Sequence, residues 1–236
     1  MINRFGIEEK EYSGGVPEQL ELIHREGQIA APMAYVMLRR VECLEEGTSE
    51  EERAFWNTSL FDSSDGIAEH PDGRYKIVYS AFNLDFQQWG RIMREGEFVL
   101  NDGMYESLQG IEFSRQKNVL KQDFTLGEIL ASREWKTFVR HPDIVLSEKA
   151  FDKRLLEQYA RRCVFTRFKT AMGLYLSDVP RKPRLQAACV YWLEGRSRFN
   201  VSYDLDGYGW RLVGIAPEAL EAARLRSYEV CGRLSN

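Results

Sequence analysis

The sequence predicts an α+β fold, in which helices flank an antiparallel sheet that includes a C-terminal three-stranded meander. Helix-start signals and short β-rich segments follow one another without the regular βαβ alternation of a parallel sheet. Proline stands at the start of the first and last amphipathic segments, at Pro17 and Pro217. Two turn dipeptides, Glu194-Gly195 and Asp206-Gly207, separate three β-rich segments near the C-terminus.

The composition is that of a chain with a hydrophobic core. Of the 236 residues, 44% are hydrophobic and 29% are charged, close to the average of globular proteins. We expect a single α+β domain over residues 1–236, and the helical character of the first third leaves a separate N-terminal subdomain, residues 1–66, as an alternative.

Three helices are expected in the N-terminal region. Pro17 is a suitable first helical residue for 18–26. Pro32 opens a second helix, whose apolar residues share one face while Glu42, Glu45 and Glu46 face water. Thr48 and Glu51 have the spacing of a capping box for the third helix.

The pattern then becomes β-rich. Pro71-Asp72-Gly73 is a turn signal and precedes an expected strand, 74–82. Asn83 is a candidate cap for a short helix that reaches Arg94. Residues 97–100 and 104–113 are expected to form a hairpin around the turn Asn101-Asp102-Gly103.

Two further helices are expected in the middle of the chain. Thr125 and Glu128 form a capping box that opens a helix reaching about Val139. Ser147 is a candidate cap for a long helical stretch, 148–176. The apolar stripe of this stretch changes face near 163–166, so the helix is either buried on several sides or broken there.

The C-terminal region has the clearest predicted architecture. Residues 185–193, 196–203 and 210–215 are expected to pair consecutively as antiparallel strands, because turn dipeptides separate them and apolar residues alternate in the second. Pro217 then starts the last helix.

Cysteine spacing and hydropathy indicate a reducing compartment, the cytoplasm. The four cysteines, Cys43, Cys163, Cys189 and Cys231, are far apart and form no CxxC pair. The first ten residues lack the apolar stretch of a signal peptide, and no run approaches the length of a membrane span. We expect four free thiols, a cytoplasmic location and no association with a membrane.

No catalytic motif stands out, so the catalytic residues stay unassigned. The Walker loop, the Gly-x-Ser-x-Gly elbow and the His-Glu-x-x-His zinc motif are all missing, and we expect neither a cofactor nor a metal. The tripeptide His-Pro-Asp occurs at 70–72 and again at 141–143, where Pro and Asp are typical of turns.

Three functional hypotheses remain. The first is a soluble binding protein with an apolar pocket or a partner-binding surface, whose partner is a protein or a small molecule. The aromatic content of 12% supports this, and the candidate ligand-binding residues are Trp192, Trp210 and Tyr203.

The second hypothesis is a nucleic-acid-associated protein, which ranks below the first. Residues 1–118 hold 12 Lys+Arg and 22 Asp+Glu, a net −10, whereas 119–236 hold 20 and 14, a net +6. The candidate nucleic-acid-binding residues are basic and lie in the second half: Arg161, Arg162, Lys169, Arg181, Lys182 and Arg184. The alternative is that the two halves attract each other. The third hypothesis is an enzyme with an unmarked pocket, using scattered carboxylates or His141.

Overall fold

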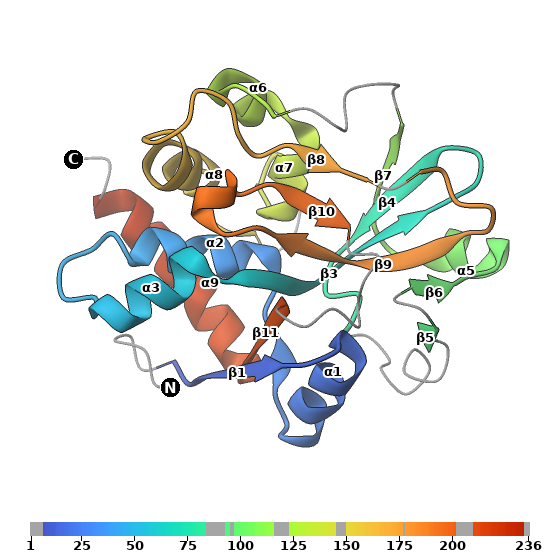
Figure 1. Ribbon diagram of the computed structural model, residues 1–236, viewed down its shortest axis with the longest axis horizontal. Helices are drawn as coiled ribbons and strands as arrows, with labels where there is room; N and C mark the ends of the chain where they lie inside the picture. Colours follow the sequence, from blue (N-terminus) through green and yellow to red (C-terminus); the bar gives the residue numbers. More distant parts are fainter. Residues whose placement is uncertain are drawn as a thin grey trace.

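A computed structural model describes residues 7–83, 93–94, 97–115, 123–144, 150–176, 178–201 and 210–233. Its strands form one mixed sheet, whose main path runs β1-β11-β3-β9-β10-β8 (Figure 1). The strands are β1 (Glu9–Ser13), β2 (Ile29–Ala30), β3 (Leu60–Glu69), β4 (Arg74–Val78), β5 (Met93–Arg94), β6 (Glu97–Val99), β7 (Ile111–Ser114), β8 (Leu174–Tyr175), β9 (Arg184–Val190), β10 (Phe199–Val201) and β11 (Trp210–Ile215). The helices are α1 (Val16–Arg25), α2 (Met33–Glu42), α3 (Glu50–Thr58), α5 (Asp102–Ser107), α6 (Leu126–Ala131), α7 (Arg133–Phe138), α8 (Leu155–Gln158) and α9 (Pro217–Arg233).

The sheet has β3 at its centre. This strand pairs antiparallel with β9 and β4, and parallel with β11. β11 in turn pairs antiparallel with β1, so the N-terminal and C-terminal parts of the chain lie side by side. The predicted α+β class is confirmed, but the sheet is mixed and not purely antiparallel.

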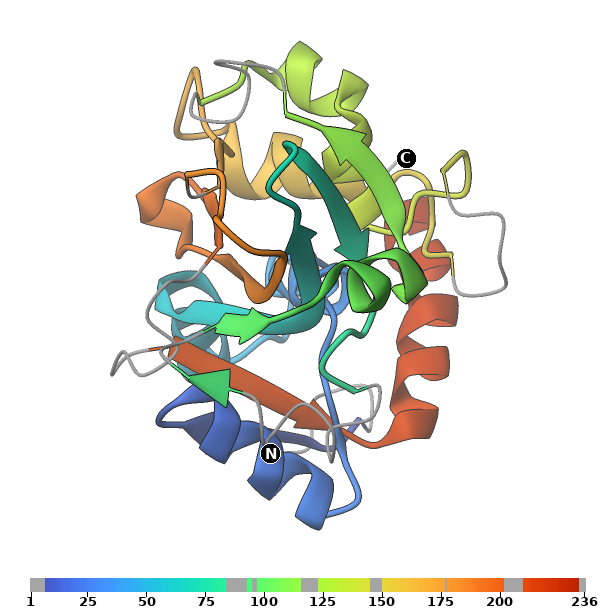
Figure 2. The same ribbon diagram turned by 90° about the vertical axis from the view of Figure 1, so that its right-hand side faces the viewer.

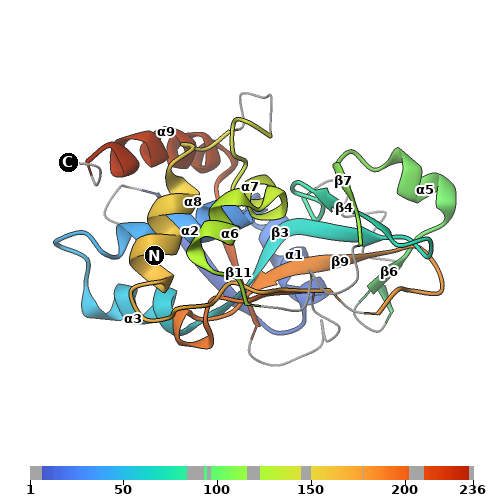
Figure 3. The ribbon, with the colours of Figure 1, turned by 90° about the horizontal axis from the view of Figure 1, so that it is seen from above.

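Two hydrophobic clusters pack against the sheet. The larger one includes buried residues of α2, α7, α8 and α9, and the smaller one includes residues of α1 and α5. Figure 3 shows α7, α8 and α9 together on one side of the sheet, with α5 at one end of the molecule and α3 at the other. Figure 2 shows that α9 runs along the edge of the molecule directly after β11.

Several helix starts agree with the sequence. α1 begins at Val16 with Pro17 in its first turn, and α2 begins directly after Pro32. The capping box of Thr125 and Glu128 is present at the start of α6. α9 begins at Pro217, as predicted, and continues to Arg233. Local signals were sufficient here because caps and proline act within a single helical turn.

The prediction that Glu42 faces water was wrong. Glu42 is 2% exposed, and the Arg39 guanidinium donates to its carboxylate while Arg226 of α9 lies 3.6 Å away. Burial raises the pKa of Glu42 to about 7, although both arginines lower it. The cap of α3 also lies one residue later than predicted, because the Ser49 side chain accepts from the Glu52 amide.

The predicted hairpin over 97–113 was wrong. Asn101 accepts from the Met104 amide and caps the short helix α5, so 102–107 is helical. The flanking segments are strands, but they do not pair with each other: β6 pairs with β5 and β9, whereas β7 pairs with β4. The helix expected from Asn83 to Arg94 was wrong at its end, because Met93–Arg94 forms β5, which pairs with β6; residues 84–92 lie outside the described residues.

The long helix expected over 148–176 is broken where its apolar stripe changes face. α8 passes into a π-helical turn, Tyr159–Val164, which ends at Phe165. The predicted cap, Ser147, lies outside the described residues. The preceding helix is also divided, because Ser132 ends α6 and caps α7.

The predicted C-terminal meander is half correct. β9 and β10 pair antiparallel, with a short 3₁₀ turn at Leu193–Gly195 between them. The third strand, β11, pairs with β1, β2 and β3 instead of β10. On its other side β10 pairs in parallel with β8. The preference for consecutive strands to pair is overridden here by the longer β1 and β3 edges.

All four cysteines belong to the described part of the chain, where they are buried and form no disulfide. Among the described helices, none combines the length and the hydropathy that a membrane-spanning helix requires.

Candidate functional site

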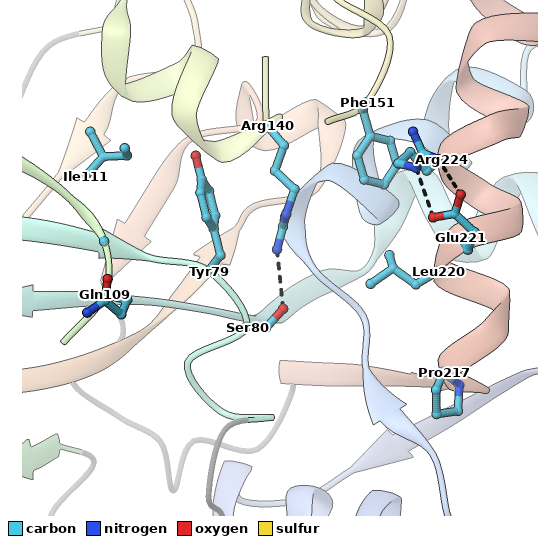
Figure 4. A pocket seen from close by; sticks show the side chains of 11 residues that line it. Tyr79, Ser80, Gln109, Ile111, Arg140, Phe151, Pro217, Leu220, Glu221 and Arg224 are labelled. Atoms are coloured by element: carbon cyan, nitrogen blue, oxygen red, sulfur yellow. Dashed lines mark hydrogen bonds and ion pairs between the residues drawn. The ribbon is translucent and has the colours of Figure 1, made fainter. Parts of the chain in front are cut away.

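A pocket of about 570 Å³ lies between the end of β4, the start of β7, the segment after α7 and the start of α9 (Figure 4). This volume is within the range of sites for small molecules, about 300–1,000 Å³. Eleven residues line it: Tyr79, Ser80, Gln109, Gly110, Ile111, Arg140, Phe151, Pro217, Leu220, Glu221 and Arg224. The pocket therefore joins four segments that are far apart in the sequence.

The first two turns of α9 form one wall of the pocket. Pro217, Leu220, Glu221 and Arg224 have the spacing i, i+3, i+4, i+7, which places them on one face of the helix. Leu220 presents its apolar side chain to the cavity, whereas Glu221 accepts two hydrogen bonds from Arg224 (Figure 4). This wall is thus apolar in its first part and carries an internally neutralised ion pair in the next turn.

Arg140 is the central polar side chain of the pocket. Arg140 is 3% exposed, and its guanidinium donates to both carboxylate oxygens of Asp65, at 2.8 and 3.2 Å. Asp65 lies on β3 and also accepts from the amides of Met33 and Ser80, each at 2.9 Å. Four hydrogen bonds satisfy the buried Asp65 carboxylate. The carboxylate in turn holds the Arg140 guanidinium in position and balances its charge.

Two residues of the pocket have a left-handed backbone. Ser80 has a φ of 50° and Arg140 a φ of 52°, a conformation that is uncommon outside glycine. The Arg140 guanidinium donates to the Ser80 hydroxyl at 3.4 Å, and the Arg140 carbonyl accepts from the Phe151 amide at 3.2 Å. Such strained residues concentrate at ligand-binding sites, where the surrounding structure holds them.

Tyr79 completes the polar part of the pocket. The Arg140 guanidinium carbon lies 4.7 Å from the centre of the Tyr79 ring. Burial raises the pKa of Tyr79, while Arg140 lowers it. The hydroxyl therefore stays protonated at neutral pH and can donate a hydrogen bond.

The described lining residues offer apolar surface and hydrogen-bond donors. Among the described residues of the lining there is no cysteine or histidine, and the two carboxylates at the site, Asp65 and Glu221, each accept hydrogen bonds from an arginine. Across the described ranges, no group of three His, Cys, Asp or Glu side chains is arranged to hold a metal ion. The pocket offers an apolar surface with a small number of fixed donors.

Of the predicted ligand-binding residues, Trp192 is not among those that line this pocket. Trp192 is half-buried in the turn between β9 and β10, and its ring lies 5.5 Å from that of Tyr191. Trp210 begins β11, where its backbone pairs with Leu60. Tyr203 lies outside the described residues.

The predicted basic residues are divided among different environments. Arg161 is exposed and paired with Glu157, Arg162 is half-buried, and Lys169 is exposed. Arg181 and Lys182 are exposed in the segment before β9. Arg184 is buried and donates to Glu69 of β3 at 2.9 Å, so it is not part of an exposed surface.

Sequence reasoning missed Arg140, Tyr79 and Ser80. The available signal was the turn at 141–143, which directly follows Arg140. There the Asp143 amide donates to His141 at 3.2 Å, and the backbone turns from α7 towards Phe151. Burial lowers the pKa of His141, which is placed as a turn residue and does not line the pocket.

Comparisons with known proteins give a likeness of fold. No family model matches the chain, and no curated protein matches it. One solved structure, reported as showing the accommodation of massive sequence variation in Nanoarchaeota by the C-type lectin fold, is similar with a TM-score of 0.56. The likeness covers 91% of this chain and 100% of that one, at 14% sequence identity. At this identity the comparison concerns the fold alone.

Proposed function

We propose that the protein is a binding protein that takes a small molecule in the pocket between β4, β7, Arg140 and α9. The observation that carries this proposal is the pocket itself, which joins Tyr79, Phe151 and Leu220 with a buried, fixed arginine. The likeness to a C-type lectin fold is compatible with a binding domain, because one fold can host many functions and the site it carries decides which.

Binding of a neutral fluorescent probe tests the proposal. N-phenyl-1-naphthylamine becomes fluorescent in apolar cavities and is suited to a site of this volume. We expect saturable binding to the wild type, because the pocket removes apolar surface from water. Filling the cavity by Leu220→Trp should abolish this binding.

Leu225→Trp is the matched control. Leu225 also lies on α9, but it is 55% exposed and does not line the pocket. This variant should bind the probe as the wild type does. The proposal is wrong if the wild type fails to bind the probe, or if Leu220→Trp and Leu225→Trp bind it equally.

A second candidate is a partner-binding surface around Trp192. The specific observation is that aromatic and arginine side chains gather there: Arg196 lies over Phe168, Arg198 lies over Tyr175, and Tyr191 contacts Trp192. Trp, Tyr and Arg are enriched at the energetic centres of protein interfaces. Trp210 and Tyr203 are the other proposed contributors to this surface.

A photo-crosslinking residue tests the second candidate. Placed at position 192, it should give one discrete adduct in the cell of origin, whereas the same residue at exposed position 225 should not. Equal adducts at both positions would argue against it. The nucleic-acid alternative has less support, because Arg184 is buried and Arg161 is already paired with a carboxylate.

A further inference from the structure

The strand β7 has one paired edge and one open edge. It pairs antiparallel with β4, and no other strand of the described residues pairs with it. The Arg115 amide donates to the Gly73 carbonyl at 2.9 Å, so the hydrogen bonds to β4 fall on residues 111, 113 and 115. In an antiparallel pair the residues between them point the other way. The amides and carbonyls of Glu112 and Ser114 are therefore directed away from β4.

This outward edge is accessible. Glu112 and Ser114 are exposed, and so is Gly110, which directly precedes the strand. Because Gly110 has no side chain, its exposed surface is backbone. Within the described ranges, the outward amides and carbonyls of Glu112 and Ser114 have no hydrogen-bond partner. They form the alternating row of donors and acceptors that an added strand completes.

The other edges of the sheet are protected and β7 is not. Three of the five residues of β1 are charged, and β2, β5 and β8 have two residues each. Charge and shortness are common protections of an edge against an added strand. β7 has four residues in unbroken register with β4, and its one charged side chain, Glu112, is paired with Arg74. Among the edges in the described part of the chain, β7 is the most open to an added strand.

The pocket begins where this edge begins. Gln109, Gly110 and Ile111 line the pocket at the start of β7. Figure 4 shows Phe151 and Leu220 on the opposite side of the pocket, where they provide apolar surface. A strand added along β7 would therefore place its backbone at the edge and a side chain near its end in the pocket.

The charges at the pocket favour an uncharged side chain. Asp65 neutralises Arg140, and Glu221 neutralises Arg224, its neighbour one helical turn away. A charged side chain would enter without a partner of its own, which costs free energy in a partly enclosed site. An apolar side chain gains free energy by leaving water.

We propose that an extended segment of a partner protein adds to the sheet along β7 and inserts one apolar side chain into the pocket. This inference rests on the proposed function that the pocket binds a ligand, and it specifies that ligand as a peptide side chain. The occupant is an extended peptide because the open groups are backbone donors and acceptors at strand spacing, for which another strand is complementary. The backbone bonds give affinity and the pocket selects the side chain.

A phage-displayed library of random octapeptides tests the proposal. Selection on the wild type should enrich peptides that share an apolar residue at one position. A fluorescein-labelled synthetic copy of the most enriched peptide then gives a dissociation constant by fluorescence polarisation. Leu220→Trp should weaken this binding, because it fills the pocket, whereas the exposed Leu225→Trp should not.

Ser114→Pro tests the edge itself. Proline removes the outward amide and places its ring at the edge, so the peptide should bind about tenfold more weakly or worse. The pairing of β7 with β4 does not use this amide and should persist, which circular dichroism and thermal denaturation check. Ser114→Ala is the matched control, since it removes the hydroxyl and keeps the amide, and it should bind as the wild type does.

N-methylated peptides give a measurement on the unchanged protein, which decides the question even if Ser114→Pro does not fold. Only every second amide of an added strand faces its neighbour. Methylation of single amides in turn should therefore weaken binding at alternate positions and leave it unchanged at the positions between.

The outcomes separate the two proposals. If N-phenyl-1-naphthylamine binds but no peptide is enriched, the pocket binds ligands and the peptide proposal is overturned. If neither binds, the proposed function fails as well. Equal peptide affinity of Ser114→Pro and Ser114→Ala, or an effect of N-methylation that does not alternate, overturns the added strand. A dimer in sedimentation that Ser114→Pro dissociates would assign the edge to a second copy of this chain and overturn the proposal of a partner segment.

Discussion

Asp65 on β3 and Arg140, 75 residues later in the chain, form a buried ion pair through both oxygens of the carboxylate. Asp65 has no exposed surface, and the Arg140 side chain is 4% exposed. Through the same carboxylate, β3 is connected to the first amide of α2 and to the backbone of Ser80. A single side chain of the central strand thus holds three segments, two of which, at Ser80 and Arg140, line the pocket.

Asp65→Asn should lower the free energy of unfolding by about 3–5 kcal/mol, because it leaves a buried guanidinium without its counter-charge. Urea denaturation followed by circular dichroism measures this. The control is Glu157→Gln, which breaks an exposed pair with Arg161 of α-helical spacing and should cost no more than about 0.5 kcal/mol. Equal losses in the two variants would contradict the role given to Asp65.

Arg40→Lys should also be strongly destabilising. The buried Arg40 guanidinium donates to the carbonyls of Trp56, Ser59 and Tyr191, and so connects α2 with the end of α3 and with β9. Lysine lacks the fork that reaches several acceptors at once, and each buried acceptor left without a donor costs about 1–3 kcal/mol. Arg161→Lys, at an exposed position, is the control and should leave the urea midpoint unchanged.

Asp62→Asn should change how stability depends on pH. The Asp62 carboxyl is buried on β3, neither of its oxygens has a hydrogen-bond partner among the described residues, and burial raises its pKa to about 8. The folded state therefore binds a proton that the unfolded state releases near pH 4, so the wild type loses stability as pH rises from about 4 to about 8. Asparagine carries no ionisable group and removes this loss.

The measurement is the free energy of unfolding of both proteins from pH 4 to pH 9. The difference, Asp62→Asn minus wild type, should increase with pH over this interval and then level off above pH 8. Glu21→Gln, on the exposed side of α1, should give a difference that does not increase in this way. A flat difference for Asp62→Asn would show that the carboxyl is ionised in the folded state.

The cysteines should be unreactive in the folded protein. Burial raises the pKa of Cys43, Cys163 and Cys231 to about 12, and Cys189 is also fully buried. The reactive thiolate is therefore scarce and inaccessible at pH 8. We expect a thiol-specific dye to label the native protein slowly and to count four thiols after denaturation without reductant.

Ala222→Cys provides the positive control for this labelling. Position 222 is exposed on α9, so the added thiol should react promptly while the other four do not. Rapid labelling of the wild type would contradict the buried positions, and a count of two or fewer thiols in the denatured protein would indicate a disulfide.

The sequence by itself determined the features that depend on neighbouring residues. Pro17, Pro32 and Pro217 mark helix starts, and Thr125 with Glu128 forms the predicted capping box. The turn between β9 and β10 was also predicted from the sequence, since a short connection is sufficient to pair two neighbouring strands. Each of these signals acts over a few residues, so one stretch of sequence contains the whole cause.

Only the tertiary structure decided the pairing of β11 and the content of the pocket. β11 pairs with β1, which lies some 200 residues earlier in the chain. This pairing depends on a strand that is distant in sequence, so the residues around β11 do not predict it. β3 carries the polar run Asp62–Asp65, which lacks the pattern of a buried strand, and Asp65 is stable there because Arg140 supplies its charge from the far side of the chain. A buried charge is tolerated only when an oppositely charged group lies beside it in the folded protein. The residues around Asp65 do not indicate a partner that is 75 residues away in the sequence.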